Sequence, residues 1–336
     1  MLLKDFDFDL PDSQIAAMPA EPRDHSRLLV FRRETGQISH HTFHELPSLL
    51  SPSDLLVLNN TRVISARLFA TDAVGHSYEI FLLRKTPEPL TWRCLVKPGR
   101  RVKGESEVIF ADGMRALVKR RLDGDGFEVK FETALADDFE AWLERNGKTP
   151  LPPYIKRPAT AGDRERYQTV FAKDPGSIAA PTAGLHFTPE LLSKFQGQTT
   201  ELTLHVGYGT FAPIQTENVG EHKMHSETYI VSNDLWETMS NTRAKGGRVI
   251  PVGTTSLRTL ESLEPGRHSG STSLFIRPGF SFRFTDGLIT NFHLPQSSLF
   301  VLICALIGTQ EAKACYQEAI EKGYRFYSYG DAMLIL

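Results

Sequence analysis

Histidines and other side chains capable of chemistry concentrate in the second half of the chain, in segments rich in Gly, Pro and Thr. Five of the eleven histidines lie at motif-like places between Pro181 and Asp331, at predicted strand ends: His186, His205, His222, His225 and His293. Imidazole titrates near neutral pH, so each could serve as a general acid or base. A hydrogen-bonded structural histidine is the alternative for each one taken alone. Their place in loops at strand ends favours a functional site for the group.

The segment Val252-Gly253-Thr254-Thr255-Ser256-Leu257-Arg258 leads from a predicted buried strand into a predicted helix. Backbone N–H groups at a helix start have no partner within the helix, and the helix dipole favours negative charge there. Thr254, Thr255 and Ser256 add hydroxyl donors, which suits a phosphate or a carboxylate. The alternative is that Ser256 merely caps the helix.

Three further segments carry ligand-type side chains. His222–Glu227 could form half of a metal site, although no other segment has the spacing of partner ligands. Asn291–Pro295, which contains His293, follows a predicted strand, where an open α/β sheet places its ligands. Arg325 and Asp331 lie in the last strand-like stretch among tyrosines, which suits contacts to nucleobases or phosphates, with core packing as the alternative.

Several large enzyme classes are disfavoured by missing motifs. The chain contains no Walker-type phosphate loop, no G-x-G-x-x-G after a strand, no G-x-S-x-G elbow and no H-E-x-x-H helix. Nucleotide kinases, dinucleotide dehydrogenases, serine hydrolases and zincins are therefore not expected.

Length and composition indicate a globular protein of the cytoplasm. The 336 residues are 40% hydrophobic and 23% charged, with a formal net charge of −2. The longest apolar run is about ten residues, against the roughly 18 to 20 of a membrane helix. The N-terminus is acidic rather than signal-like. Three widely spaced cysteines favour neither disulfides nor a cysteine-rich zinc site.

The charge is unevenly distributed. Between Arg84 and Arg121 the chain has eleven basic and four acidic residues, a net +7, which leaves −9 for the remainder. Such an asymmetry suggests a face for a polyanion. The alternative is an ordinary β-surface whose Lys and Arg protect sheet edges.

Periodicity predicts an α/β protein with an inserted β-barrel. Six short strands separated by turns such as Asp112-Gly113 lie between residues 63 and 132, which is typical of a small antiparallel barrel. Strands and helices alternate after that region. We therefore expect a three-layer α/β catalytic domain over 1–62 and 150–336, interrupted by a β-barrel domain over 63–149.

Many segments, in the same order along nearly the whole chain, resemble one enzyme family, the S-adenosylmethionine:tRNA ribosyltransferase-isomerases of queuosine biosynthesis. The segments are Leu58–Val63, Leu151–Pro158, Arg166–Val170, Ala180–Phe187, Leu204–Gly207, Gly209–Phe211, His222–Glu227, Gly253–Ser256, Thr290–Pro295 and Tyr324–Met333. One departure is Tyr208, where the family usually has alanine, which would narrow the pocket near His205.

The resemblance implies an unusual reaction. The ribosyl part of S-adenosylmethionine is transferred to 7-aminomethyl-7-deazaguanine at the tRNA wobble position and isomerised to give epoxyqueuosine, with release of adenine and methionine. Substrate tRNAs have a GUN anticodon, those for Asp, Asn, His and Tyr. S-adenosylmethionine is a co-substrate, and no resident cofactor or metal is expected. The resemblance also implies an α/β domain with an inserted barrel, and we expect a monomer.

The reaction requires bases and an acid, which we assign to candidate residues. His205, His225 and His293 are the acid/base candidates, with Glu227 as orienter or alternative base. Substrate binding is assigned to Thr182, His186, Thr254, Thr255, Ser256, Arg258, Asn291 and Asp331. The first turn of the helix, with Arg258 nearby, would hold the methionine carboxylate. Contacts to tRNA are assigned to Arg100, Arg101, Lys103, Lys156, Arg157 and Arg325.

Two other functions compete. A non-catalytic tRNA-binding protein would explain the basic barrel but not the polar residues of the second half. A metal-dependent hydrolase would use His186, His222 and His225.

Overall fold

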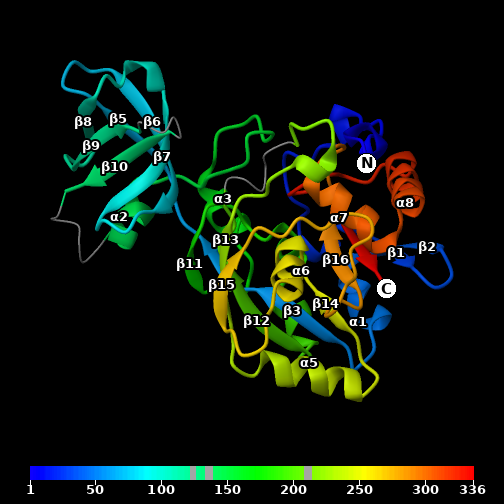
Figure 1. Cartoon of the computed structure of the whole chain (residues 1–336). Coiled ribbons are helices and arrows are strands. Elements are labelled where there is room, and N and C mark those ends of the chain that lie inside the picture. Colours follow the sequence, from blue (N-terminus) through cyan, green and yellow to red (C-terminus); the bar gives the residue numbers. More distant parts are fainter. Residues whose placement is uncertain (122–125, 133–138, 208–213) are drawn as a thin grey trace. The chain divides into compact units, whose positions relative to one another are not determined.

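The computed structural model describes residues 1–121, 126–132, 139–207 and 214–336, and the chain divides into two compact units (Figure 1). The larger unit comprises Met1–Arg62, Gln168–Asp174 and Ala180–Leu336, and the smaller comprises Val63–Tyr167 and Pro175–Ala179. The predicted class, an α/β protein with an inserted antiparallel barrel, is confirmed.

Residues 150–167, which the sequence placed in the larger domain, group with the smaller unit. Part of the reason is hydrogen bonding to the barrel strand that contains Arg67. The backbone of Arg67 pairs with that of Lys148, and the Arg67 guanidinium donates to the Leu151 carbonyl. Helix α3 (Ala161–Arg166) belongs to this extension.

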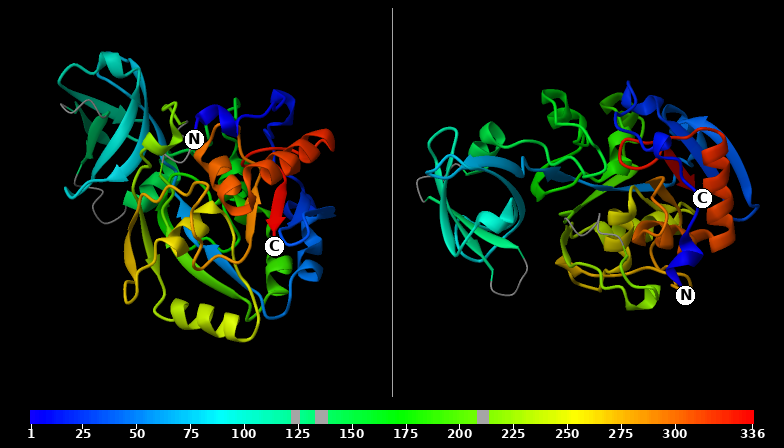
Figure 2. Two further views of the ribbon diagram at one scale, coloured as in Figure 1. Left: turned by 45° about the vertical axis from the view of Figure 1, so that its right-hand side comes forward. Right: turned by 90° about the horizontal axis from the view of Figure 1, so that it is seen from above.

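Six strands of the smaller unit close into an antiparallel barrel in the order β10-β7-β6-β5-β8-β9, and Figure 2 shows these strands arranged around a common axis. The strands are β5 (Arg67–Thr71), β6 (Ser77–Lys85), β7 (Thr91–Lys97), β8 (Glu105–Phe110), β9 (Arg115–Arg120) and β10 (Phe127–Phe131). Buried residues alternate with more exposed ones along β6 and β9, because successive side chains of a strand point to opposite faces. Helix α2 (Phe139–Asn146) contributes Trp142 to the barrel core.

The larger unit contains two sheets, of order β14-β3-β12-β13-β15 and β16-β17-β1-β2. Their strands are β1 (Arg27–Arg32), β2 (Gln37–Thr42), β3 (Leu55–Asn59), β12 (Thr199–Leu204), β13 (Glu227–Val231), β14 (Val249–Pro251), β15 (Ser269–Thr272), β16 (Leu288–Asn291) and β17 (Ala332–Ile335). A further pair, β4 (Thr61–Val63) and β11 (Asp174–Ser177), contains two of the points at which the chain passes between the units.

The described part of the larger unit contains six α-helices. They are α1 (Leu46–Leu49), α4 (Pro189–Ser193), α5 (Leu235–Ala244), α6 (Thr254–Glu261), α7 (Ser298–Ile307) and α8 (Thr309–Glu321). The Thr188 hydroxyl accepts from the Leu191 N–H and caps α4, and the Ser297 hydroxyl accepts from the Phe300 N–H and caps α7. Helix α6 lies near β3, β12 and β14 (Figure 1).

Strand direction brings three strand ends together. Both β12 and β14 run parallel to β3, and Val252 forms a parallel bridge with Ile289 of β16. The carboxyl ends of β12, β14 and β16 therefore meet at one edge, where α/β sheets place ligands.

Among the described residues, no single helix is long and apolar enough to cross a membrane. Helices α7 and α8 taken together have the length and composition of a membrane-spanning segment, but the chain bends by 115° between them.

Candidate active site

A pocket lies at the meeting strand ends of the larger unit. Its walls come from the segment before and within the 3-10 helix Thr182–His186, from the ends of β12, β14 and β16, and from α7 and the loop before β17. Five predicted site residues line it: Thr182, Thr254, Thr255, Asn291 and His293. The cavity volume is about 40 Å³, which is room for a few water molecules or for one polar end of a ligand.

The start of α6 forms one wall. Gly253, with a φ of 92°, precedes the helix and provides no side-chain cap. The Leu257 N–H donates to the Gly253 carbonyl at 3.1 Å, so the three preceding N–H groups have no partner inside the helix. The Ser256 side chain does not face a ligand, because its hydroxyl donates to the Val252 carbonyl at 3.0 Å.

His293 is buried and also lines the pocket. Its Nε2 lies 3.0 Å from the Thr290 hydroxyl, and its backbone N–H donates to the Tyr316 hydroxyl at 3.1 Å. Burial disfavours the charged ring and lowers the pKa of His293 to about 3. The imidazole is therefore neutral at pH 7, and it acts by hydrogen bonding more readily than by carrying a proton.

His186 lies behind the pocket wall and contacts a residue that lines it. Its Nδ1 is 2.7 Å from the Ser26 hydroxyl, and its Nε2 is 3.1 Å from the Asn291 Nδ2. Burial lowers the pKa of His186 to about 4, and the charge of Asp331 opposes this shift in part. His186 is therefore neutral, and it touches the site through Asn291.

His205 is half-buried directly after β12, and its Nδ1 lies 2.8 Å from the Thr61 hydroxyl. The next residue, Val206, lines the pocket. The strand end is fixed by Asn59, whose side chain exchanges two hydrogen bonds of 3.0 Å with the Leu204 backbone and contacts the Thr255 hydroxyl at 3.4 Å.

Three other predicted site residues are engaged with the protein itself. Glu227 and Arg258 form a buried ion pair of 2.5 Å, with side chains 5% and 3% exposed. Glu227 also accepts from the Gly207 N–H at 3.0 Å. Asp331 accepts from the backbone N–H groups of Arg27 and Arg325 and from the Arg325 guanidinium. These carboxylates hold the walls of the site rather than face its interior.

His222 and His225 lie outside the pocket wall. His222 packs against the Phe275 ring with ring centroids 5.3 Å apart, and His225 is exposed. In the part of the chain that the structure describes, no group of three or more His, Cys, Asp or Glu side chains is placed to hold a metal ion. The set required by the hydrolase alternative is therefore not assembled there.

The residues assigned to tRNA differ in availability. Arg100, Arg101 and Lys103 are exposed on the barrel and have no carboxylate partner among the described residues. Arg157, by contrast, forms a two-pronged ion pair with Asp163, with both distances 2.7 Å. That guanidinium, together with bonds from Thr160, holds the pKa of the Asp163 carboxyl well below its usual range.

Lys156 is exposed, whereas Arg325 is half-buried and bound to Asp331 at 3.2 Å. Arg157 and Arg325 therefore hold the fold together, and of these three residues only Lys156 resembles the exposed barrel cations.

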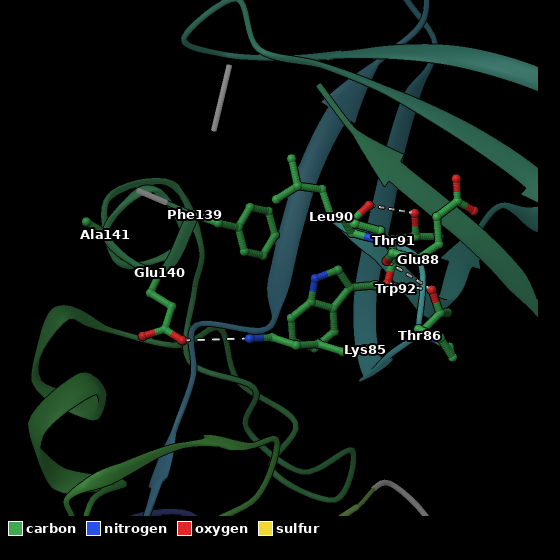
Figure 3. A pocket seen from close by; sticks show the side chains of 11 residues that line it. Lys85, Thr86, Glu88, Leu90, Thr91, Trp92, Phe139, Glu140 and Ala141 are labelled. Carbon is green, nitrogen blue, oxygen red and sulfur yellow. Dashed lines mark hydrogen bonds and ion pairs between the residues drawn. The ribbon is translucent and has the colours of Figure 1, made fainter. Parts of the chain in front are cut away.

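A larger hollow of about 520 Å³ on the barrel unit lacks the features of a reaction site (Figure 3). Its Lys85 is paired with Glu140 at 3.7 Å, and its Glu88 is paired with Lys130 at 2.5 Å. The Trp92 ring is only 4% exposed and packs against Phe139, so it offers no open face for stacking. Its charged groups are paired with carboxylates or ammonium groups of the protein itself, so this hollow is not the candidate site.

Tyr327, Ser328 and Leu299 also line the pocket, and none of the three is predicted from the sequence. Tyr327 has a φ of 76°, a strained conformation for a bulky residue and one that clusters at functional sites. A tyrosine-rich Tyr-Ser-Tyr-Gly turn was the available signal, but aromatic residues there also suit a core. Tyr208 lies outside the described residues.

Comparison with known proteins shows the family of the chain. The family model for queuosine biosynthesis proteins matches residues 3–335. S-adenosylmethionine:tRNA ribosyltransferase-isomerases of Pelobacter propionicus and Gloeobacter violaceus are 48% and 50% identical, over all of this chain and over 100% and 96% of theirs. A crystal structure of an S-adenosylmethionine tRNA ribosyltransferase from Thermotoga maritima is 37% identical, with a TM-score of 0.56, and covers 99% of this chain and 100% of its own. The chain therefore belongs to the queuosine biosynthesis protein family.

Proposed function

We propose that this protein is a transferase and isomerase that moves the ribosyl part of S-adenosylmethionine to 7-aminomethyl-7-deazaguanine in tRNA. The product is epoxyqueuosine at the wobble position of tRNAs with a GUN anticodon, and adenine and methionine leave. The observation that carries the proposal is one pocket that combines a helix start with open N–H groups, two threonine hydroxyls and a neutral imidazole. Similarity to the named relatives over the full chain supports it.

The chemistry sets requirements that these residues can meet. The sulfonium makes the adjacent ribose methylene acidic, so a base removes a proton there and leaves a carbanion stabilised by sulfur. Adenine departs with a proton supplied by an acid, and the incoming amine attacks in its uncharged form. We assign proton transfer to His205, with His225 as a second candidate. We assign hydrogen bonding within the pocket to His293, which burial keeps neutral.

Adenine release tests the proposal directly. Purified protein is incubated with S-adenosylmethionine and tRNA that carries the aminomethyl precursor, and free adenine is measured by chromatography. We expect adenine only when both substrates are present. A tRNA-binding protein would release none, and a hydrolase would release it without tRNA or not at all.

We further propose that the exposed barrel cations contact tRNA phosphates. Arg100→Ala/Arg101→Ala should weaken tRNA binding and lower the slope of log affinity against log salt by about 1 to 2, because each lost phosphate contact removes roughly 0.7 to 0.9. Arg115→Ala/Lys119→Ala is the matched control, since those cations are paired with Glu107 and Glu105 at 2.9 and 3.1 Å. An unchanged slope in the first variant would reject this face.

The enzyme is proposed to work in the cytoplasm as a monomer without a resident metal or cofactor. No step of the reaction is a redox step, and the sulfonium itself activates the ribose. A transition-metal chelator should therefore leave the turnover of pure enzyme on prefolded tRNA unchanged. Loss of turnover that added metal restores would refute this expectation.

A further inference from the structure

In the part of the chain that the structure describes, the Asn291 side chain has one polar atom without a partner. The residue is 2% exposed and lines the pocket. Its Nδ2 donates to the Tyr327 carbonyl at 3.1 Å and lies 3.1 Å from the His186 Nε2. Its Oδ1 has no hydrogen-bond partner among the described residues. A buried acceptor without a donor costs free energy that a ligand donor would recover.

The neighbouring groups fix which way the amide faces. The Tyr327 carbonyl can only accept, so the NH₂ group of Asn291 must point to it. The second N–H then points to the His186 Nε2, which must be unprotonated, and the His186 Nδ1–H donates to the Ser26 hydroxyl. This chain of bonds, made of residues at most 8% exposed, leaves the oxygen as the one side-chain polar atom of Asn291 without a partner among the described residues.

The start of α6, which also lines the pocket, favours an anion rather than a hydrogen-bond donor. The first turn of α6 presents N–H groups without partners in the helix, together with the Thr254 and Thr255 side chains. Such a helix start favours a carboxylate or phosphate. The pocket therefore combines a site for an anion with an acceptor for a donor, within a volume of about 40 Å³. An α-amino acid has a carboxylate and an ammonium on one carbon, which are the two kinds of group that this lining favours.

We propose that this pocket binds the methionine end of S-adenosylmethionine, with the carboxylate at the start of α6 and the ammonium on the Asn291 oxygen, and that His186 positions Asn291. This inference rests on the proposed function. Neither charged group changes during the reaction, so their contacts stabilise ground state and transition state alike. His186 is a positioning residue, and its effect on binding passes through Asn291.

Substrate kinetics of Asn291→Ala test the assignment. We expect the KM for S-adenosylmethionine to rise about 10- to 100-fold, the range of a lost charge-assisted hydrogen bond, with kcat nearly unchanged. His186→Ala should raise the KM less, and His186→Gln should restore much of the loss, because a Gln side chain also accepts and donates. Asn241→Ala, an exposed residue of α5, is the matched control.

An analogue of S-adenosylmethionine without its α-amino group separates this role from a structural one. Wild-type enzyme should bind the analogue at least about 10-fold more weakly than S-adenosylmethionine, and Asn291→Ala should bind the two about equally. The wild-type measurement stands even where the variant does not fold. Equal binding of both compounds by wild type, or the same loss for both in Asn291→Ala, would overturn the inference. If wild-type enzyme releases no adenine with both substrates, the proposed function itself fails, which is a separate result.

Discussion

His205→Ala should lower the single-turnover rate by about 10²- to 10⁴-fold, the usual contribution of a positioned general base, while S-adenosylmethionine and tRNA still bind. His205 follows β12 at the edge where the strand ends meet, and its neighbour Val206 lines the pocket. The Thr61 hydroxyl, 2.8 Å from Nδ1, orients the ring. The ring is half-buried, so it can exchange a proton with substrate without the full desolvation that His293 suffers.

Chemical rescue makes the test specific. Added imidazole should restore part of the lost rate in His205→Ala, because a small base can occupy the vacated space. His41→Ala, which removes a partly exposed imidazole near Glu45, is the matched control and should react at the wild-type rate. His293→Ala should show a smaller loss without rescue, since a ring with a pKa of about 3 is not a proton carrier at neutral pH. A wild-type rate in His205→Ala would remove His205 as the base.

Local patterns predicted the barrel and the strand-to-helix segment that begins α6, because both depend on nearby residues. Turns such as Asp112-Gly113 and alternation along β6 and β9 are readable within ten residues or so. The second sheet of the larger unit is different. Its strand β1 pairs in parallel with β17, so that Leu28 lies opposite Ala332 across nearly the whole chain. No local pattern specifies such a partner, and this sheet was not predicted.

The candidate site also contains residues that local motifs predict and residues whose partners come from distant parts of the chain. Motif position at strand ends was enough to predict Thr255, Asn291 and His293, which line one pocket. Partnerships of charged residues could not be derived from spacing. Arg258 was assigned to a carboxylate of the substrate, but the fold brings Glu227 to it from 31 residues away. Asp331 is likewise held by groups of Arg325 and of Arg27, the latter from the other end of the chain. Long-range pairing decided which polar residues remain available to a ligand.

Arg258→Ala should destabilise the larger unit by about 3–5 kcal/mol, which corresponds to a fall in Tm of roughly 6–20 °C. The variant leaves the Glu227 carboxylate buried without its cation, whereas in the native fold the pair is 2.5 Å apart and nearly inaccessible. Arg258 also donates from Nε to the Leu274 carbonyl at 3.0 Å, so a second contact is lost. Thermal unfolding followed by circular dichroism measures the effect.

Arg267→Ala is the matched control, because Arg267 pairs with Glu264 at 2.9 Å with both side chains more than half exposed. Such pairs contribute about 0–1 kcal/mol. The double variant Glu227→Gln/Arg258→Met should be less destabilised than Arg258→Ala, because it removes both charges and keeps an acceptor for the Gly207 N–H. A Tm for Arg258→Ala as close to wild type as that of Arg267→Ala would contradict a stabilising ion pair.

The single variant Glu227→Gln decides the role of Glu227. As a partner of Arg258 and of the Gly207 N–H, its carboxylate holds α6 to the segment after β12, which are two walls of the pocket. Glu227→Gln should therefore lose stability but keep its single-turnover rate at temperatures where it is folded. If Glu227 were a base or held the substrate in position, Glu227→Gln would instead lower the single-turnover rate of folded protein by about 10²-fold or more. Because Glu227 is bound on both sides by the protein itself, we expect the loss of stability.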